Sequence, residues 1–397
     1  MSIVFINCTG ETFTPTRSGA ISTWNWEVCR AALRNGVEPW VISRATTAPP
    51  HSWKRSILLE YPWIPQFRGS GLGRLFEFQR RLGHWGHIRQ GAYAAKVISA
   101  IREHGLTKMP FVLHNDPEMA VFLRRCFPSA RILHLFHNTN TCGARCRREY
   151  PKAVTIAAGV SDFTSRWQES YFQMPESAVR TVYNGVDLAA FSPAEPPAPG
   201  PTVINFLGRT DASKAPDLLL RAALKLAATS RDFAVQILGA RFYWGSEPDP
   251  YQRELDSLVR QLSDQGIPVR RPGVITRPAL PSELRRAHIH VVPSRWDEPF
   301  GLTSLEGMAS GLPIVASRTG GTPEIVSGAG FLFERDDAEG LASHLKRLLD
   351  EPDLRKEYGR RARERAEKFS WDKTWRRIHS LLFPERTDSL KPLSSRL

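Results

Sequence analysis

The sequence has 397 residues, of which 41% are hydrophobic and 24% are charged. These proportions are ordinary for a globular protein and exclude a chain that is disordered along most of its length. The length exceeds one ordinary domain of roughly 100–200 residues, so we expect two domains with separate cores. Five cysteines, an odd number in a long chain, favour a reducing compartment over a disulfide framework.

The formal net charge is +14, and the basic excess is concentrated in the first half of the chain. Residues 51–90 hold seven Lys or Arg residues and two acidic ones among several aromatic residues. This mixture can bind an anionic acceptor or lie on an anionic membrane surface, with Arg80 and Arg81 as candidate contacts. A solvated helical face with its aromatic residues turned to the core explains the pattern equally well. No nucleic-acid recognition motif accompanies the charge, so nucleic acid is not expected as a partner.

The sequence shows no segment that targets it into or across a membrane. No apolar run approaches the ~20 residues of a spanning helix, and the N-terminal run 3–6 has only the length of a strand. We expect a cytoplasmic protein, with peripheral contact to the inner face of the membrane as a further option. Cys142 and Cys146 have C-x3-C spacing without a second Cys or His pair nearby, so we expect unpaired thiols and no metal site.

Short β-branched or apolar runs alternate with helical patterns in both halves, which is typical of βαβ units around parallel sheets. We therefore expect an α/β protein with two Rossmann-like domains. The predicted strands of the first half are 2–7, 38–43, 111–114, 131–136 and 153–157. Those of the second half are 202–207, 234–238, 289–293, 312–316 and 330–333.

A Pro-rich segment, 192–201, divides the chain almost in half, because it cannot continue a helix or a central strand. It predicts an N-terminal domain over 1–191 and a C-terminal domain over 202–370. An amphipathic helix over 371–384 follows, and a flexible tail is expected over 385–397. The apolar face of that helix needs a partner, and the N-terminal domain is our candidate.

Polar residues of the first half follow predicted strands, at the sheet edge where α/β folds bind ligands. Gly19 and Ala20 precede a predicted helix without the G-x-G-x-x-G spacing of a dinucleotide fold, so no NAD site is expected. These small residues still let the backbone approach a ligand closely. His114 and Asn115 follow one strand and His137 follows another. His137 is the better candidate for a reacting centre, with a purely structural histidine as the alternative.

Arg209 and Lys214 lie in the predicted strand-to-helix turn that opens the second half. Two fixed cations at this position would balance the charge that develops on a nucleoside diphosphate leaving group. A pair of surface cations at a turn is the alternative. The chain has no D-x-D carboxylate pair, so a bound metal is not the obvious source of positive charge.

A loop that contains Glu298 leads to Gly301, and a helix is predicted to begin near Leu302. The start of a helix presents unpaired amide groups and a positive dipole end, where a diphosphate fits. Glu298 can accept hydrogen bonds from sugar hydroxyls, and Glu306 can bind the two ribose hydroxyls of a nucleotide. The alternatives are an exposed loop acid at Glu298 and a capping box between Thr303 and Glu306.

Along nearly its whole length the chain resembles the retaining family-4 glycosyltransferases of GT-B fold. The resemblance rests on four motifs: Glu298 and Glu306 with Pro299-Phe300-Gly301, Gly208-Arg209 with Lys214, the segment 183–191, and Gly320-Gly321 with Pro323-Glu324. The N-terminal half resembles a subgroup that includes spore-coat and lipopolysaccharide-core transferases. Gly19-Ala20 stands where many relatives have two glycines.

The resemblance implies two domains facing across a cleft, and retaining transfer of a sugar from a nucleotide sugar without metal or cofactor. The acceptor would be a carbohydrate, a lipid-linked molecule or another acceptor. Arg209 and Lys214 would hold the diphosphate, Glu306 the ribose and Glu298 the transferred sugar, with His137 beside it. The remaining expected donor-binding residues are Gly19, Ala20, Val274, Ile275, Phe300, Gly301 and Leu302. The expected acceptor contacts are Arg80, Arg81, His114 and Asn115, and a UDP-sugar is favoured from its frequency in the family.

Two other functions compete with this interpretation. A GT-B-like sugar-nucleotide epimerase or hydrolase would use the same donor pocket without an acceptor. A protein that binds an anionic polymer would rely on the charge of +14, and its binding would collapse with added salt.

Overall fold

The computed structural model describes residues 2–15, 19–60, 84–193, 200–241 and 250–385, with 84–90 as backbone only. The chain divides into two compact units. The first comprises Met1–Tyr183 with Trp371–Leu397, and the second comprises Asn184–Ser370.

Several features expected from the sequence lie outside the described residues. They are Arg80 and Arg81, the central part of the Pro-rich segment (194–199) and the tail from residue 386. The domain limits at 191 and 202 stay predictions. The Pro-rich segment belongs to the residue range of the second unit.

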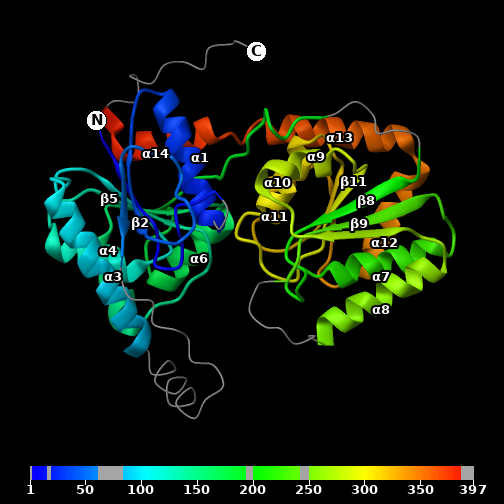
Figure 1. Ribbon diagram of the computed structural model, residues 1–397, viewed down its shortest axis with the longest axis horizontal. Helices are drawn as coiled ribbons and strands as arrows, with labels where there is room; N and C mark the ends of the chain where they lie inside the picture. The colour runs from blue at the N-terminus through cyan, green and yellow to red at the C-terminus, as the bar shows by residue number, and fades with distance from the viewer. Residues whose placement is uncertain (1, 16–18, 61–83, 194–199, 242–249, 386–397) are drawn as a thin grey trace. The chain divides into compact units, whose positions relative to one another are not determined.

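The described part of the first unit forms a sheet of seven parallel strands in the order β3-β2-β1-β4-β5-β6-β7 (Figure 1). The strands are β1 (Val4–Ile6), β2 (Trp40–Arg44), β3 (Ser56–Leu59), β4 (Phe111–His114), β5 (Ile132–Phe136), β6 (Ile156–Gly159) and β7 (Val179–Thr181). The helices are α1 (Ala20–Arg34), α3 (His84–Glu103), α4 (Pro117–Cys126), α5 (Ala144–Ala153), α6 (Asp162–Phe172) and α14 (Trp371–Leu382). Helices α1 and α14 cover one face of the sheet, and α3 to α6 cover the other.

The central strands of this sheet are buried on both faces, as their continuous apolar sequences predict. All residues of β4 and β5 are buried, and Phe111 and Phe136 belong to a core shared with helices α3 to α6. On the other face, α14 packs on α1, where Arg34 Nη2 lies 2.8 Å from Asp372 Oδ2. Trp375 of α14 is fully buried. The expected return of the C-terminal helix to the N-terminal half is therefore confirmed.

The second unit contains, among its described residues, a sheet of six parallel strands in the order β10-β9-β8-β11-β12-β13. The strands are β8 (Thr202–Leu207), β9 (Phe233–Leu238), β10 (Val269–Gly273), β11 (Ile289–Val292), β12 (Ile314–Ser317) and β13 (Phe331–Phe333). The helices are α7 (Pro216–Ala227), α8 (Pro250–Asp264), the 3-10 helix η1 (Arg277–Ala279), α9 (Leu280–Leu284), α10 (Leu302–Ala309), α11 (Thr322–Val326), α12 (Ala338–Asp350) and α13 (Pro352–Ala366). Figure 1 shows α7, α8 and α12 on one side of the sheet and α10 and α13 on the other.

Both sheets have a topological switch point. There, the connections that follow two adjacent parallel strands lead toward opposite edges of the sheet. In the first sheet these strands are β1 and β4, and in the second they are β8 and β11. Ligands of open α/β sheets bind outside the carboxyl ends of strands at such points. The loops after β8 and β11 carry Arg209, Lys214 and Glu298, so the fold puts these residues at the binding edge.

Every strand predicted from the sequence has a counterpart, and the expected α/β class with two parallel sheets is confirmed. The prediction missed β3, β7 and β10, which lie at the outer edges of the two sheets. Among the described residues, no helix is long and apolar enough to cross a membrane.

Candidate active site

The loop that follows β11 ends at Gly301, and α10 begins at Leu302. Gly301 has a φ of 89°, a left-handed conformation that residues with a Cβ rarely adopt. No side chain of the described residues caps this helix start. The first amide groups and the positive dipole end of α10 therefore lie at the sheet edge without a side-chain cap.

Two buried hydroxyl groups lie beside the start of α10. Ser304 and Thr322 are both 0% exposed, and their hydroxyl oxygens have no hydrogen-bond partner among the described residues. Both oxygens lie next to Gly301, at 3.2 and 3.8 Å from the point where a Cβ on that residue would be. A buried polar group without a partner costs about 1–3 kcal/mol. Two such groups at an uncapped helix start indicate a site for a polar ligand.

Glu298 and Lys214 form an ion pair at this edge. Lys214 Nζ lies 2.5 Å from Glu298 Oε1, and the Ser294 hydroxyl donates to the same oxygen at 2.5 Å. Glu298 is only 6% exposed, so the alternative of a solvent-exposed loop acid is wrong. The carboxylate is held between the loops after β8 and β11.

The second glycine cluster supports the backbone at Glu298. Gly320 has a φ of 53°, and a Cβ there would come within 2.3 Å of the Glu298 carbonyl oxygen and 2.6 Å of its nitrogen. Gly321 N donates to the same carbonyl at 2.7 Å. Only glycine at position 320 allows this close approach, which explains why the motif accompanies Glu298.

Glu306 is paired with a residue that sequence reasoning missed. Its carboxylate is 3% exposed and forms an ion pair with Arg277 of η1. The Arg277 guanidinium also lies 5.3 Å from the centre of the Phe191 ring. The capping box with Thr303 is not formed, because Gly301 is the N-cap and its helix start has no side-chain cap among the described residues. The only signal for Arg277 was its place two residues after Ile275, one of the expected donor-binding residues.

The other donor-side candidates have different surroundings. Arg209 pairs with Asp211 at 2.9 Å, within the same loop. Val274 is 57% exposed and Ile275 is half-buried, both just after β10. Phe300 is buried and makes an edge contact with Phe369, with ring centres 6.1 Å apart, so its ring belongs to the core.

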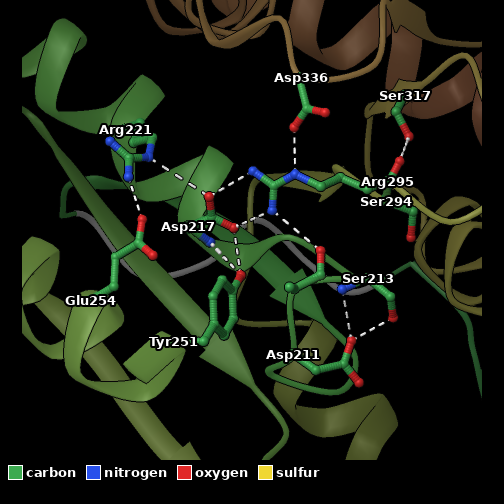
Figure 2. A network of polar contacts seen from close by, with 11 residues as sticks. Asp211, Ser213, Asp217, Arg221, Tyr251, Glu254, Ser294, Arg295, Ser317 and Asp336 are labelled. Atoms are coloured by element: carbon green, nitrogen blue, oxygen red, sulfur yellow. Dashed lines mark hydrogen bonds and ion pairs between the residues drawn. The ribbon is translucent and has the colours of Figure 1, made fainter. Parts of the chain in front are cut away.

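A polar network fixes the two loops relative to each other (Figure 2). Arg295 Nη1 and Nη2 donate to the two carboxylate oxygens of buried Asp217 at 2.8 and 2.7 Å, and Tyr251 donates to Asp217 at 2.5 Å. Burial raises the pKa of Asp217, but the hydrogen bonds from Arg295 and Tyr251 outweigh this, so the pKa is lowered overall. Figure 2 shows Arg295 between Asp217 and Asp336, with which it forms a second ion pair.

The same network includes the backbone next to Lys214. The amide groups of Arg295 and Trp296 donate to the carbonyl oxygen of Ser213 at 2.9 and 3.0 Å. Arg295 thus connects the β11 loop, the β8 loop and the start of α7. The sequence did not reveal this role, because Arg295 and Asp217 are far apart along the chain.

In the first unit, the expected His and Asn residues come together. His114 Nδ1 lies 3.0 Å from His137 Nε2, and the Asn115 side-chain oxygen accepts from the His137 amide at 2.7 Å. His114 Nε2 lies 2.9 Å from the side-chain oxygen of Asn25. Trp24 contacts both imidazole rings, with ring centres at 4.9 and 5.4 Å. Trp24 and Asn25 lie on α1, and sequence reasoning missed them both.

Burial keeps these histidines uncharged. Loss of hydration lowers the pKa of His137 to about 3. The pKa of His114 is also lowered, first by burial and then by the neighbouring histidines. His134 points elsewhere: its Nε2 accepts from the Asp116 amide at 3.1 Å, and its Nδ1 lies 2.9 Å from the Tyr150 hydroxyl.

The Gly19-Ala20 turn holds a carboxylate of the protein itself. Gly19 N donates to Glu11 Oε2 at 3.0 Å, and Ala20 is the first residue of α1. A Cβ on Gly19 would come within 2.1 Å of that carboxylate. The turn therefore lets the Glu11 carboxylate approach the Gly19 backbone closely, and the expected approach of a ligand there stays a prediction.

Comparison with known proteins identifies the family. Residues 189–365 match the family model "Glycosyl transferases group 1". This segment, which makes up most of the second unit, belongs to that family. The expected retaining, nucleotide-sugar-dependent glycosyltransferase class is thereby confirmed. The residues expected to bind the donor lie in the matched segment, except for those of the N-terminal half.

Similar proteins extend the match beyond this segment. Spore coat protein SA of Bacillus subtilis is 24% identical over 73% of this chain and 81% of that protein. D-inositol 3-phosphate glycosyltransferase of Saccharomonospora viridis is 35% identical over 50% of this chain, and the match spans 48% of its own length. The structure of Anabaena HepE in complex with UDP shares the fold, with a TM-score of 0.67 and 16% identity over 97% of this chain and all of that one. The GT-B fold of this glycosyltransferase is therefore confirmed.

Replacing Arg295 with Lys should weaken donor binding, because a single ammonium cannot form the two-pronged contact with Asp217. A hydrogen bond to a charged group is worth about 1.5–3 kcal/mol, so we expect a ten- to hundred-fold rise in the dissociation constant of UDP. Calorimetric titration measures it. Asp336→Asn is the matched control, since it removes only the exposed partner of Arg295. A lower melting temperature with unchanged UDP affinity would show that the network is only structural.

Replacing His134 with Gln should reduce the acid sensitivity of the first unit. Burial lowers the pKa of His134 to about 3 from 6.5, so the unfolded state binds one more proton between these pH values. Stability is then lost as pH falls below 6.5, by about 1.4 kcal/mol per pH unit. Hydrogen exchange of β5 amides at pH 7, 6 and 5 should show a shallower pH dependence in the variant. If the protection of these amides depended on pH equally in the wild type and in the variant, His134 would not be the source of the acid sensitivity.

Proposed function

We propose that the loops after β8 and β11, together with the start of α10, bind the nucleoside diphosphate of a UDP-sugar. The observation that carries this proposal is the pair of buried hydroxyls, Ser304 and Thr322, beside the uncapped start of α10. Phosphate oxygens are strong acceptors that would satisfy both hydroxyls and the first amides of the helix. The UDP named for the HepE structure supports the choice of nucleotide.

The ion pair between Lys214 and Glu298 supports their roles at the reacting end of the donor. As the sugar leaves, negative charge develops on the diphosphate, and a fixed ammonium stabilises it. Arg209, in the same loop, would add a second cation, with no metal required. The Glu298 carboxylate, whose Oε1 is bound to Lys214 and Ser294, would accept hydrogen bonds from hydroxyls of the transferred sugar.

Glu306 and the segment after β10 would hold the nucleoside. The Glu306 carboxylate is a strong acceptor for two ribose hydroxyls, and its pairing with Arg277 reduces the cost of its burial. Arg277 lies two residues after Ile275, and we assign the backbone of Val274 and Ile275 to the uracil base. Base, ribose and diphosphate would then follow one another along the carboxyl edge of the sheet.

In the first unit, we assign His137 to the transferred sugar. Its imidazole is neutral at physiological pH, so it offers a hydrogen bond rather than a charge. His114 and Asn115 fix its ring and its backbone. We further propose a carbohydrate or lipid-linked acceptor, with Arg80 and Arg81 contacting it or an anionic membrane surface on the cytoplasmic side.

Replacing Glu306 with Gln tests the donor site. Loss of a charged acceptor worth about 1.5–3 kcal/mol should weaken UDP binding ten- to hundred-fold. Calorimetric titrations with UDP and GDP measure the effect. Glu283→Gln is the matched control, because Glu283 forms a similar ion pair with Arg270 in the same unit. Unchanged UDP affinity in Glu306→Gln would remove Glu306 from the site, whereas a preference for GDP would overturn only the choice of base.

Chelation tests the source of positive charge. If Arg209 and Lys214 balance the diphosphate, the dissociation constant of UDP should agree within about twofold in EDTA and in magnesium, since no phosphate contact passes through a metal. Lys214→Ala should lose affinity in both solutions. UDP binding that requires magnesium or manganese would contradict the metal-free mechanism.

A further inference from the structure

Three metal-ligating side chains converge in the first unit, in a place that the proposed transfer does not use. The ligand atoms of Glu118, Cys142 and Cys146 all lie within 4.8 Å of one another. Glu118 lies in the first turn of α4, Cys142 just before α5, and Cys146 in the first turn of α5. Sequence spacing showed the cysteine pair alone, because only the packing of α4 against α5 brings in the carboxylate.

The backbone at Cys142 is held in place by α6. The Tyr171 hydroxyl accepts from Cys142 N and donates to Cys142 O, both at 2.8 Å. The Tyr171 ring in turn stacks on Trp167, with ring centres 4.9 Å apart and planes 7° apart. Cys142 is therefore positioned without any help from a ligand. Cys146 is buried, whereas Cys142 is half-exposed and accessible to ions.

The starts of two helices lie at this place. Helices α4 and α5 both begin here, and their positive dipole ends stabilise carboxylate and thiolate groups. The α5 start at Gly143 has no side-chain cap among the described residues. The ligand atoms of the two cysteines and of Glu118 are close enough to one another for a single cation to contact all three.

We propose that Glu118, Cys142 and Cys146 bind a thiophilic divalent cation such as Zn²⁺. Zn²⁺ accepts cysteine thiolates and a carboxylate together, whereas Mg²⁺ and Ca²⁺ prefer oxygen ligands alone. Tetrahedral zinc holds two sulfurs about 3.8 Å apart, so small rotations of these side chains suffice. Water would complete the coordination, and each thiol that is protonated beforehand releases its proton to solvent on binding.

Such an ion would cross-link α4 to the segment between His137 and α5. This segment contains Cys142, so binding would restrict the backbone that follows His137. None of its three ligands is among the residues assigned to the donor, and the donor residues of the β8 and β11 loops belong to the second unit. We therefore expect it to stabilise the first unit without contributing to UDP binding.

Cobalt titration of the reduced, metal-free full-length chain tests the site, since Zn²⁺ itself is spectroscopically silent. One equivalent of Co²⁺ should give a thiolate-to-cobalt charge-transfer band, and added Zn²⁺ should remove it. Cys142→Ser and Cys146→Ser should each abolish or strongly reduce the band. Even outer-shell partners of metal ligands contribute about 10–100-fold in affinity, so Glu118→Gln should weaken Co²⁺ binding at least about tenfold.

Two controls separate this site from other thiols and from the donor site. Cys126→Ser removes an exposed cysteine at the far end of α4 and should leave the band unchanged. Zn²⁺ should raise the melting temperature of the wild type and of Cys126→Ser but not of Cys142→Ser, while all three bind UDP equally. The proposal would be overturned if the wild type gave no band, or if the band survived in the double variant that carries both Cys142→Ser and Cys146→Ser. It would also be overturned if peroxide oxidised Cys142 and Cys146 to a disulfide while the reduced protein bound no Co²⁺.

Discussion

The two-pronged contact between Arg295 and Asp217 is the interaction on which the geometry of the proposed donor site depends. Asp217 is buried at the start of α7, and an unpaired carboxylate there would be strongly destabilising. Arg295 neutralises it from the β11 loop, and backbone bonds to Ser213 connect the same loop to the β8 loop. Lys214 and Glu298 therefore meet because two loops are held in place elsewhere. Their own contact, at the edge of the site, remains available for exchange with a ligand.

The doubly wound topology explains why functional residues from distant parts of the chain collect at two places. At the switch point of each sheet, adjacent strands lead into loops that diverge, so polar side chains there are not covered by a crossover helix. In the second unit these loops provide cations and carboxylates. In the first unit, the ends of β4 and β5 provide neutral imidazoles, His114 and His137, next to each other.

Sequence patterns predicted the central strands and the shared sheet edge of Lys214 and Glu298, because both follow from rules that act along the chain. Continuous apolar runs identify buried strands, and residues after such strands share one sheet edge. The missed strands β3, β7 and β10 lie at sheet edges, where burial is partial and the apolar signal is weak. Arg277 and Glu118 were missed for another reason. Their partners are chosen by packing between distant elements, which spacing in one sequence does not encode.

The charge balance of the donor side shows how one set of residues can be stable both without and with a nucleotide sugar. Glu298 is paired with Lys214, and Glu306 with Arg277, so neither buried carboxylate is left unneutralised in the free protein. A nucleotide sugar brings hydroxyl donors for the carboxylates and phosphate anions for the cations. Each side chain would thus exchange its protein partner for a ligand group that forms hydrogen bonds with it. Binding would then add a charged molecule to a buried edge while every charged group keeps a hydrogen-bonding partner, whereas a hydrophobic pocket would have to desolvate the diphosphate uncompensated.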